Sequence, residues 1–163
     1  MAKKKLITNA MRMLSAEKIE FEAIEYDGEG LLDGDDFGGK IAELTGIEPE
    51  RSFKTLVARG EKKGVMVFCI PVNAECDLKK AAKVSGDKKV ELIHVKELLG
   101  LTGYIRGGVT PIGMKKKYPT YIHESCLNFE KMAISAGVCG GTLLIKPQDV
   151  IRITDAVTAD IVQ

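Results

Sequence analysis

Hydrophobic positions near the start of the chain recur with the spacing of an α-helix. They predict an amphipathic helix over about residues 5–17, with an apolar face formed by Leu6, Ile7, Ala10, Met11 and Leu14. A second helix is expected over residues 41–47, where Gly46 is a candidate C-cap. Short helices are expected over residues 78–84 and 95–99. A last helix should begin at Pro147, because a proline in the first helical turn loses no hydrogen bond.

Short runs rich in apolar and β-branched residues separate these helices. Residues 53–59 and 65–72 flank a polar turn bounded by glycines, so they predict a β-hairpin. Further strands are expected over residues 21–26, 120–123, 131–135 and 142–146. The elements do not alternate as regular βαβ units. The pattern therefore predicts an α+β fold over residues 1–163, one domain with a curved, barrel-like mixed sheet flanked by short helices.

The composition suits a globular chain of 163 residues, 45% of them hydrophobic. No run approaches the ~20 apolar residues of a membrane helix, and no apolar signal region follows the basic N-terminus, so we expect a cytoplasmic protein without a membrane partner. The net charge is +1, yet the charges are unevenly distributed. Residues 17–50 hold 12 acidic and 2 basic side chains, whereas residues 51–163 hold 11 acidic and 18 basic side chains. This asymmetry is compatible with a polyanionic partner and with ordinary solvated surface.

Several kinds of catalytic centre are not indicated. The four cysteines (Cys69, Cys76, Cys126 and Cys139) show no CxxC spacing, so neither a zinc site nor a dithiol site is expected. His94 and His123 stand apart from other ligand-type residues, and a structural role is expected for both. GxSxG, Walker A and GxGxxG motifs are absent from the sequence. We therefore expect no metal and no cofactor.

Two features remain as candidates for chemistry. Lys54 interrupts an apolar strand, where a lysine is costly unless it faces a cleft or a partner, although a surface lysine with a buried stem is the simpler interpretation. Residues 102–113 form a glycine-rich loop, and paired glycines there could present backbone N–H groups to an anion or to a developing oxyanion. A plain turn explains the loop equally well. Three consecutive lysines, residues 115–117, follow the loop and suit phosphates.

Together these features resemble the YbaK/EbsC family of tRNA-editing deacylases over nearly the whole chain. The resemblance rests on Phe53-Lys54-Thr55-Leu56, on Leu78-Lys79-Lys80-Ala81-Ala82, on Gly103-Tyr104 with residues 107–113, and on Pro147-Gln148-Asp149. The resemblance is strongest to the branch of the family that hydrolyses Cys-tRNA(Pro) and, together with a synthetase partner, Cys-tRNA(Cys). The branch that clears Ala-tRNA(Pro) is a near relative.

The resemblance implies roles for individual residues. Lys54 matches the family lysine that contacts the terminal nucleotide and its ester, and Gly107 with Gly108 matches the loop that holds the aminoacyl group. Tyr26 and Phe37 fall where the family places aromatic residues beside the 3′ adenosine. The remaining residues expected to contact the tRNA 3′ end are Thr55, Pro111, Gly113 and Thr142. Residues 137–142 should form another wall of the cleft, although Val138 and Cys139 stand where relatives often carry a basic residue.

The resemblance also implies a mechanism and partners. In the Cys-specific branch the thiol of the substrate attacks its own ester carbonyl, so that the protein supplies orientation and oxyanion donors and needs no strong nucleophile. The expected partners are the aminoacylated 3′ end of tRNA and a prolyl- or cysteinyl-tRNA synthetase. A non-catalytic module that binds aminoacyl-tRNA, and a plain structural domain, are the alternatives from other functional classes.

Overall fold

The computed structural model describes residues 7–28 and 37–163, without the side chains of residues 37 and 38. Its first helix, α1, spans Asn9–Ala16 and confirms most of the predicted helix. Thr8 caps α1, because its hydroxyl oxygen accepts a hydrogen bond from the Met11 N–H at 3.2 Å. The same hydroxyl donates to the carbonyl oxygen of Ala136, so the cap also ties α1 to a distant loop.

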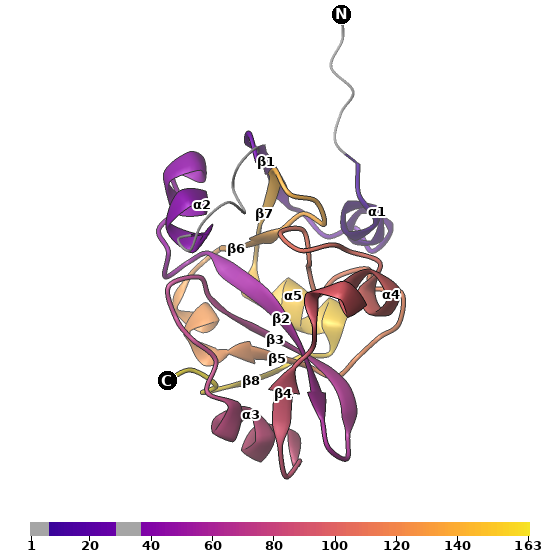
Figure 1. The fold of residues 1–163 in the computed structure, drawn as a ribbon. Helices are drawn as coiled ribbons and strands as arrows, with labels where there is room; N and C mark the ends of the chain where they lie inside the picture. Colours follow the sequence, from indigo (N-terminus) through magenta and orange to yellow (C-terminus); the bar gives the residue numbers. More distant parts are fainter. Residues whose placement is uncertain (1–6, 29–36) are drawn as a thin grey trace, which may run out of the picture.

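Three antiparallel strands form the smaller sheet, in the order β1-β7-β6. Their bounds are Glu22–Glu25 for β1, Gly141–Ile145 for β7 and Met132–Ser135 for β6. Helix α2, Phe37–Thr45, lies at one end of this sheet and α1 at the other (Figure 1). The strands predicted in these three places are confirmed.

Five strands form the larger sheet, in the order β4-β2-β3-β5-β8. The predicted hairpin is confirmed: β2 (Phe53–Gly60) pairs antiparallel with β3 (Gly64–Pro71). Strand β5 (Thr120–His123) adds to β3 in parallel, so the sheet is mixed. The sequence pattern missed the two edge strands, β4 (Val90–Leu92) and β8 (Val157–Ala159), because three residues are too few to show an alternation.

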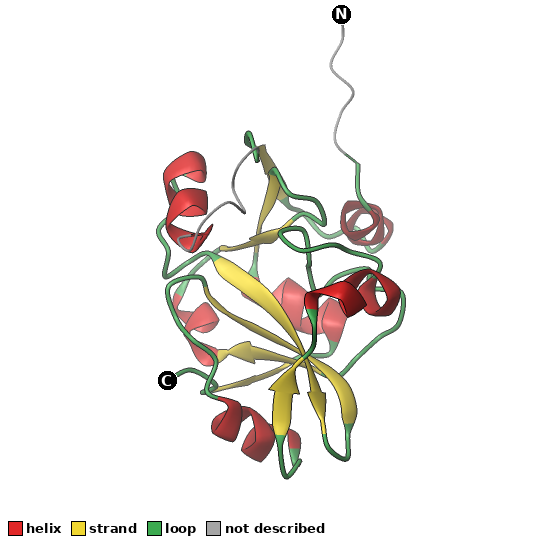
Figure 2. Cartoon of the chain, viewed as in Figure 1, coloured by secondary structure: helices red, strands yellow, loops and turns green. Residues whose placement is uncertain are grey.

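Helices cover both sheets, as Figure 2 shows. They are α3 (Leu78–Ser85), the 3₁₀ turn η1 (Val95–Glu97), α4 (Leu98–Thr102), the 3₁₀ turn η2 (Glu124–Asn128) and α5 (Pro147–Thr154). Asp77 caps α3 and Gly86 ends it in a left-handed conformation. Apolar residues of α1, α5 and the smaller sheet pack with one face of β2–β3, and α3 covers the other face.

The two sheets meet where β2 begins. Ser52 forms a parallel bridge with Ala133 of β6, and the Ala133 N–H donates to the carbonyl oxygen of Arg51 at 2.9 Å. The α+β class and the mixed sheet are confirmed, but the strands form two sheets and do not close into a barrel. This junction matters because a cavity lies beside it.

Candidate functional site

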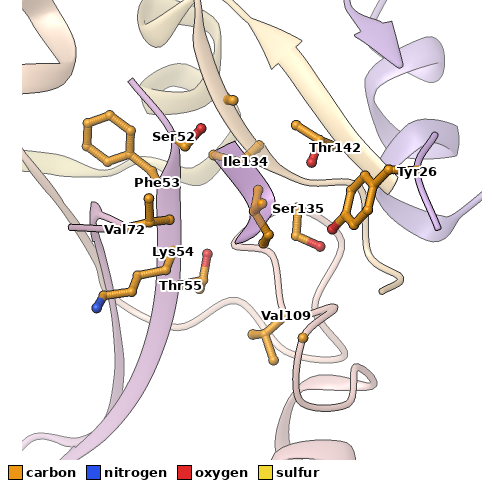
Figure 3. Close-up of a pocket in the computed structure, with 13 residues that line it drawn as sticks. Tyr26, Ser52, Phe53, Lys54, Thr55, Val72, Val109, Ile134, Ser135 and Thr142 are labelled. Atoms are coloured by element: carbon orange, nitrogen blue, oxygen red, sulfur yellow. The ribbon is translucent and has the colours of Figure 1, made fainter. Parts of the chain in front are cut away.

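A cavity of about 80 Å³ lies at the junction of the two sheets (Figure 3). It is built by the residue after β1, the start of β2 with the residue before it, the glycine-rich loop, and β6 with β7, and it is completed by one residue of α2 and one that follows β3. The described residues that line it are Tyr26, Ile41, Ser52, Phe53, Lys54, Thr55, Val72, Gly107, Val109, Ala133, Ile134, Ser135 and Thr142. Five of the nine residues predicted from the sequence are thus brought together: Tyr26, Lys54, Thr55, Gly107 and Thr142.

Lys54 is half-buried at the edge of this cavity. Burial lowers the pKa of its ammonium group, and the charges of Glu75 and Cys76 only partly oppose that effect. Lys54 and Thr55 leave β2 on opposite sides, as successive residues of a strand do (Figure 3). Within residues 7–28 and 37–163, no carboxylate lies within ion-pair distance of Lys54. The ammonium group is therefore partly dehydrated and available to an anion.

Tyr26 closes the cavity on the side opposite Lys54. Its backbone N–H donates to the carbonyl oxygen of Gly140 at 2.9 Å, which fixes the end of β1 against the loop before β7. Burial raises the pKa of the Tyr26 phenol, although hydrogen bonds with the Gly140 backbone and the Thr142 side chain oppose the shift. The phenol stays neutral near pH 7, so it can both donate and accept a hydrogen bond.

The two adjacent glycines of the glycine-rich loop have different surroundings. Gly107 lines the cavity and adopts a φ of 87°, which favours glycine. Gly108 does not line the cavity, and its N–H already donates to the carbonyl oxygen of Ile105 at 2.9 Å. A Cβ on Gly108 would lie 2.9 Å from Cα of Val138. Gly108 therefore lets the glycine-rich loop and the loop at residues 137–140 approach each other.

Pro111 and Gly113 lie away from this cavity. They line a separate hollow with Met13 and Ile153. Gly113 packs against the first turn of α1, since a Cβ there would lie 3.2 Å from the backbone nitrogen of Ala10. Phe37 begins α2, but its side chain lies outside the described part of the structure.

Sequence reasoning did not identify two hydroxyl groups in the cavity lining. Ser135 ends β6, and its oxygen accepts a hydrogen bond from the Gly137 N–H at 3.2 Å. Ser52 precedes β2 and is only 3% exposed, yet its hydroxyl has no hydrogen-bond partner among the described residues. Ser52 directly precedes the Phe53-Lys54-Thr55-Leu56 motif, but a single serine there carries no pattern from which a role could have been predicted.

The described lining combines one ammonium group, several hydroxyls and a mainly apolar inner surface. Such groups can hold an anion, accept or donate hydrogen bonds and orient a small ligand. The cysteine thiols are poor nucleophiles: burial raises the pKa of Cys69 to about 12 and that of Cys126 to about 11. In the described residues, no three His, Cys, Asp or Glu side chains converge as metal ligands would. No helix of that part of the chain is both long enough and apolar enough to cross a membrane.

Comparisons with known proteins identify the family of this chain. The family model "Aminoacyl-tRNA editing domain" matches residues 39–153. An Enterococcus faecalis protein named "Putative Cys-tRNA(Pro)/Cys-tRNA(Cys) deacylase EbsC" is 45% identical over 164 residues, covering 99% of this chain and 98% of the relative.

Two solved structures share the fold of this chain. A "putative trans-editing enzyme for prolyl tRNA synthetase" superposes with a TM-score of 0.82 at 25% identity, covering 98% of this chain and 99% of the other. The hypothetical protein APE2540 has a TM-score of 0.83 at 21% identity, covering 96% and 100%. The sequence resemblance noted above is confirmed: this chain belongs to the aminoacyl-tRNA editing domain family, in the YbaK/EbsC group.

Proposed function

We propose that this protein removes cysteine from mischarged Cys-tRNA(Pro), and from Cys-tRNA(Cys), in the cytoplasm. The name of the 45% identical relative supports the substrate, and the matched editing domain supports the class of reaction. The observation that carries the proposal is the small cavity at the sheet junction, which brings the lysine of the Phe53-Lys54-Thr55-Leu56 motif and Gly107 of the glycine-rich loop to one place.

The size of the cavity favours a small amino acid. An apolar protein cavity of roughly 150 Å³ is large enough for benzene, and this cavity measures about 80 Å³. The side chain of a small amino acid such as cysteine, serine or alanine fits such a space. We therefore assign the cavity to the aminoacyl group and the edge near Lys54 to the terminal nucleotide of the tRNA.

Lys54 is suited to the phosphate or ribose of that nucleotide. Its ammonium group is partly dehydrated, and the Lys54 and Thr55 side chains lie on opposite sides of β2. Lys54 can therefore contact the nucleotide that carries the aminoacyl group without occupying the space for that group. A charge-assisted hydrogen bond to phosphate is stronger when both partners are partly dehydrated. Gly107 then supplies a backbone N–H toward the ester carbonyl, and Tyr26 with Thr142 closes the other side.

The chemistry follows from the substrate. The thiolate of the bound cysteine attacks its own ester carbonyl, a C–S bond forms, and the bond from the carbonyl carbon to the ribose oxygen breaks. The products are a cyclic thiolactone and tRNA with a free 3′ hydroxyl, whose oxygen takes up the proton that the thiol gave up. The protein contributes orientation of the thiol and stabilisation of the oxyanion.

A panel of mischarged tRNAs tests the proposal under multiple-turnover conditions. Cys-tRNA should be deacylated much faster than Ser-tRNA, because a thiol of pKa ~8.5 ionises far more readily than a hydroxyl. The fit of the pocket alone would separate two such near-isosteres by only about 1–3 kcal/mol. The rate should rise with pH as the substrate thiol ionises. Alkylating that thiol should stop the reaction.

Three results would overturn parts of this assignment. Rapid hydrolysis of S-alkylated Cys-tRNA would show that water attacks the ester directly. Preference for Ala-tRNA(Pro) over Cys-tRNA(Pro) would place the protein with the alanine-specific branch. Tight binding of aminoacyl-tRNA without turnover would make it a carrier beside a prolyl- or cysteinyl-tRNA synthetase. Adding either synthetase to the assay tests the proposed partnership, which should increase selection for the cognate tRNA.

A further inference from the structure

The cavity lining holds four aliphatic hydroxyl groups among the described residues, and three of them have a partner within the protein. The Thr55 hydroxyl lies 3.7 Å from the sulfur of Cys69, Thr142 interacts with the Tyr26 phenol, and Ser135 accepts the Gly137 N–H. The hydroxyl of Ser52 has no partner among the described residues. Ser52 is also the most deeply buried of the four residues, at 3% exposure.

The backbone around Ser52 is held without help from this side chain. The Ser52 N–H donates to the carbonyl oxygens of Glu48 and Pro49, at 3.1 and 3.2 Å, and its own carbonyl oxygen accepts the Val72 N–H at 2.8 Å. The bridge to Ala133 adds a fourth backbone constraint. The backbone of Ser52, and with it the Cβ that carries the hydroxyl, therefore has a fixed position that does not depend on a hydrogen bond of the side chain.

Leaving a buried hydroxyl unpaired costs free energy, which an alanine at the same position would not. Ser52, directly before β2, points to the side of the cavity where Ile134 and Thr142 lie, and this end of the cavity is also lined by Phe53 and Ala133 (Figure 3). The neighbours Phe53, Ala133 and Ile134 make this end unsuitable for an α-ammonium group, which needs charged or several polar partners. This end is suited to the side chain of the substrate.

We propose that Ser52 is a specificity-determining residue whose hydroxyl donates a hydrogen bond to the sulfur of the bound cysteine. The inference rests on the proposed function and deepens it. Donation to the thiolate favours its ionised form, because a hydrogen bond to the charged form lowers the pKa of the group. Alanine has no side-chain atom that accepts this bond, so Ser52 distinguishes cysteine from alanine.

The test compares Ser52→Ala with Ser125→Ala. Ser125 is a matched control, because its hydroxyl is also buried and unpaired among the described residues but lies in η2 and does not line the cavity. Binding is measured with two minihelices that carry cysteine or alanine on the 3′ end through a non-hydrolysable amide. At a pH above the ordinary thiol pKa of ~8.5, Ser52→Ala should weaken binding of the cysteinyl minihelix about fivefold, the effect of one ordinary hydrogen bond, and leave binding of the alanyl one unchanged. Ser125→Ala should change neither.

Two further readouts separate recognition of the thiol from a merely structural effect. In Ser52→Ala, the pH midpoint of Cys-tRNA deacylation should move upward by about 0.7 pH unit, the logarithm of a fivefold change. The melting temperature should stay level or rise, since an unpaired hydroxyl is removed. Equal weakening of both minihelices, or an unchanged pH midpoint, would overturn the role of Ser52. Because the binding ratio needs no turnover, it tests Ser52 even if the wild-type protein proves not to deacylate Cys-tRNA.

Discussion

The two ends of strand β2 differ in whether the polar groups beside them have partners within the protein. Beyond Gly60, the carboxylate of Asp87 accepts hydrogen bonds from the backbone N–H groups of Lys62, Lys63 and Lys88, the shortest at 2.7 Å. Before Phe53, the Ser52 hydroxyl is unpaired and the Lys54 ammonium group is partly dehydrated. Paired polar groups stabilise a turn, whereas unpaired ones reduce stability and remain available for a ligand.

The surroundings of two glycines, Gly60 and Gly108, also differ between the two ends of β2. A Cβ on Gly60 would lie 2.0 Å from Oδ2 of Asp87, so the turn is closed around its carboxylate. At the other end, Gly108 lets two loops approach each other beside an open cavity. At the Gly60 end the Asp87 carboxylate occupies the inside of the turn, whereas the residues at the other end of β2 border the cavity of about 80 Å³.

The largest expected effect comes from Lys54→Ala. We expect kcat/KM for Cys-tRNA to fall by about 10- to 150-fold, the loss of a charge-assisted contact worth roughly 1.5–3 kcal/mol. The melting temperature should change little, because Lys54 makes no ion pair among the described residues and its burial disfavours the charge. The exposed Lys79→Ala is the control and should retain activity. A folded Lys54→Ala protein with the wild-type rate would remove Lys54 from the site.

Gly108→Ala should affect both stability and activity. The added Cβ meets the backbone of Val138 at 2.9 Å, so the two loops must separate, at a cost of about 1–3 kcal/mol of unfolding free energy. The rate should fall as well, because the same movement displaces Gly107. Gly100→Ala is the control: no atom lies within 4 Å of its Cβ, and a helical alanine should stabilise the protein slightly. Urea unfolding and deacylation assays measure the two effects. An unchanged free energy of unfolding would contradict the close approach of the loops.

Asp87→Asn tests the stabilising end of β2. Burial opposes ionisation of Asp87, but hydrogen bonds from the backbone of Lys63, Lys62, Lys88 and Lys89 outweigh it and hold the pKa of the carboxyl below its ordinary value. The wild-type protein therefore has this stabilisation above about pH 4 and loses it as the pH falls through the lowered pKa.

In Asp87→Asn the melting temperature at pH 7 should drop by a few degrees and vary less between pH 5 and 2 than in the wild type. Activity per folded molecule should stay normal, since Asp87 lies at the far end of β2 from the cavity. A melting curve that keeps its full acid dependence would mean that another carboxylate is responsible.

These two ends also differ in how far the sequence predicted them. The hairpin was predictable because alternating apolar strands and a glycine-bounded polar turn lie close together in the sequence. The cavity combines Tyr26, Lys54, Gly107 and Thr142 from segments far apart in the chain, so local pattern alone could not place them together, and the family resemblance supplied their grouping. The roles of Gly108, Pro111 and Gly113 depend on which loop each glycine or proline meets, and that contact exists only in the folded chain.

The smallest effect is expected from replacing the two partly exposed cysteines. Cys76 lies near Lys54, and Cys139 follows Val138 in the loop against Gly108. Burial raises the pKa of both thiols, so neither is an activated nucleophile. Cys76→Ser and Cys139→Ser should each keep kcat within about twofold of the wild type, and neither should shift the pH midpoint of the reaction. Treatment of the free protein with iodoacetamide should then leave deacylation intact, whereas the same treatment of the Cys-tRNA should abolish it. Loss of activity on alkylating the protein, together with resistance in the Cys76→Ser variant, would place the reactive thiol on the protein and not on the substrate.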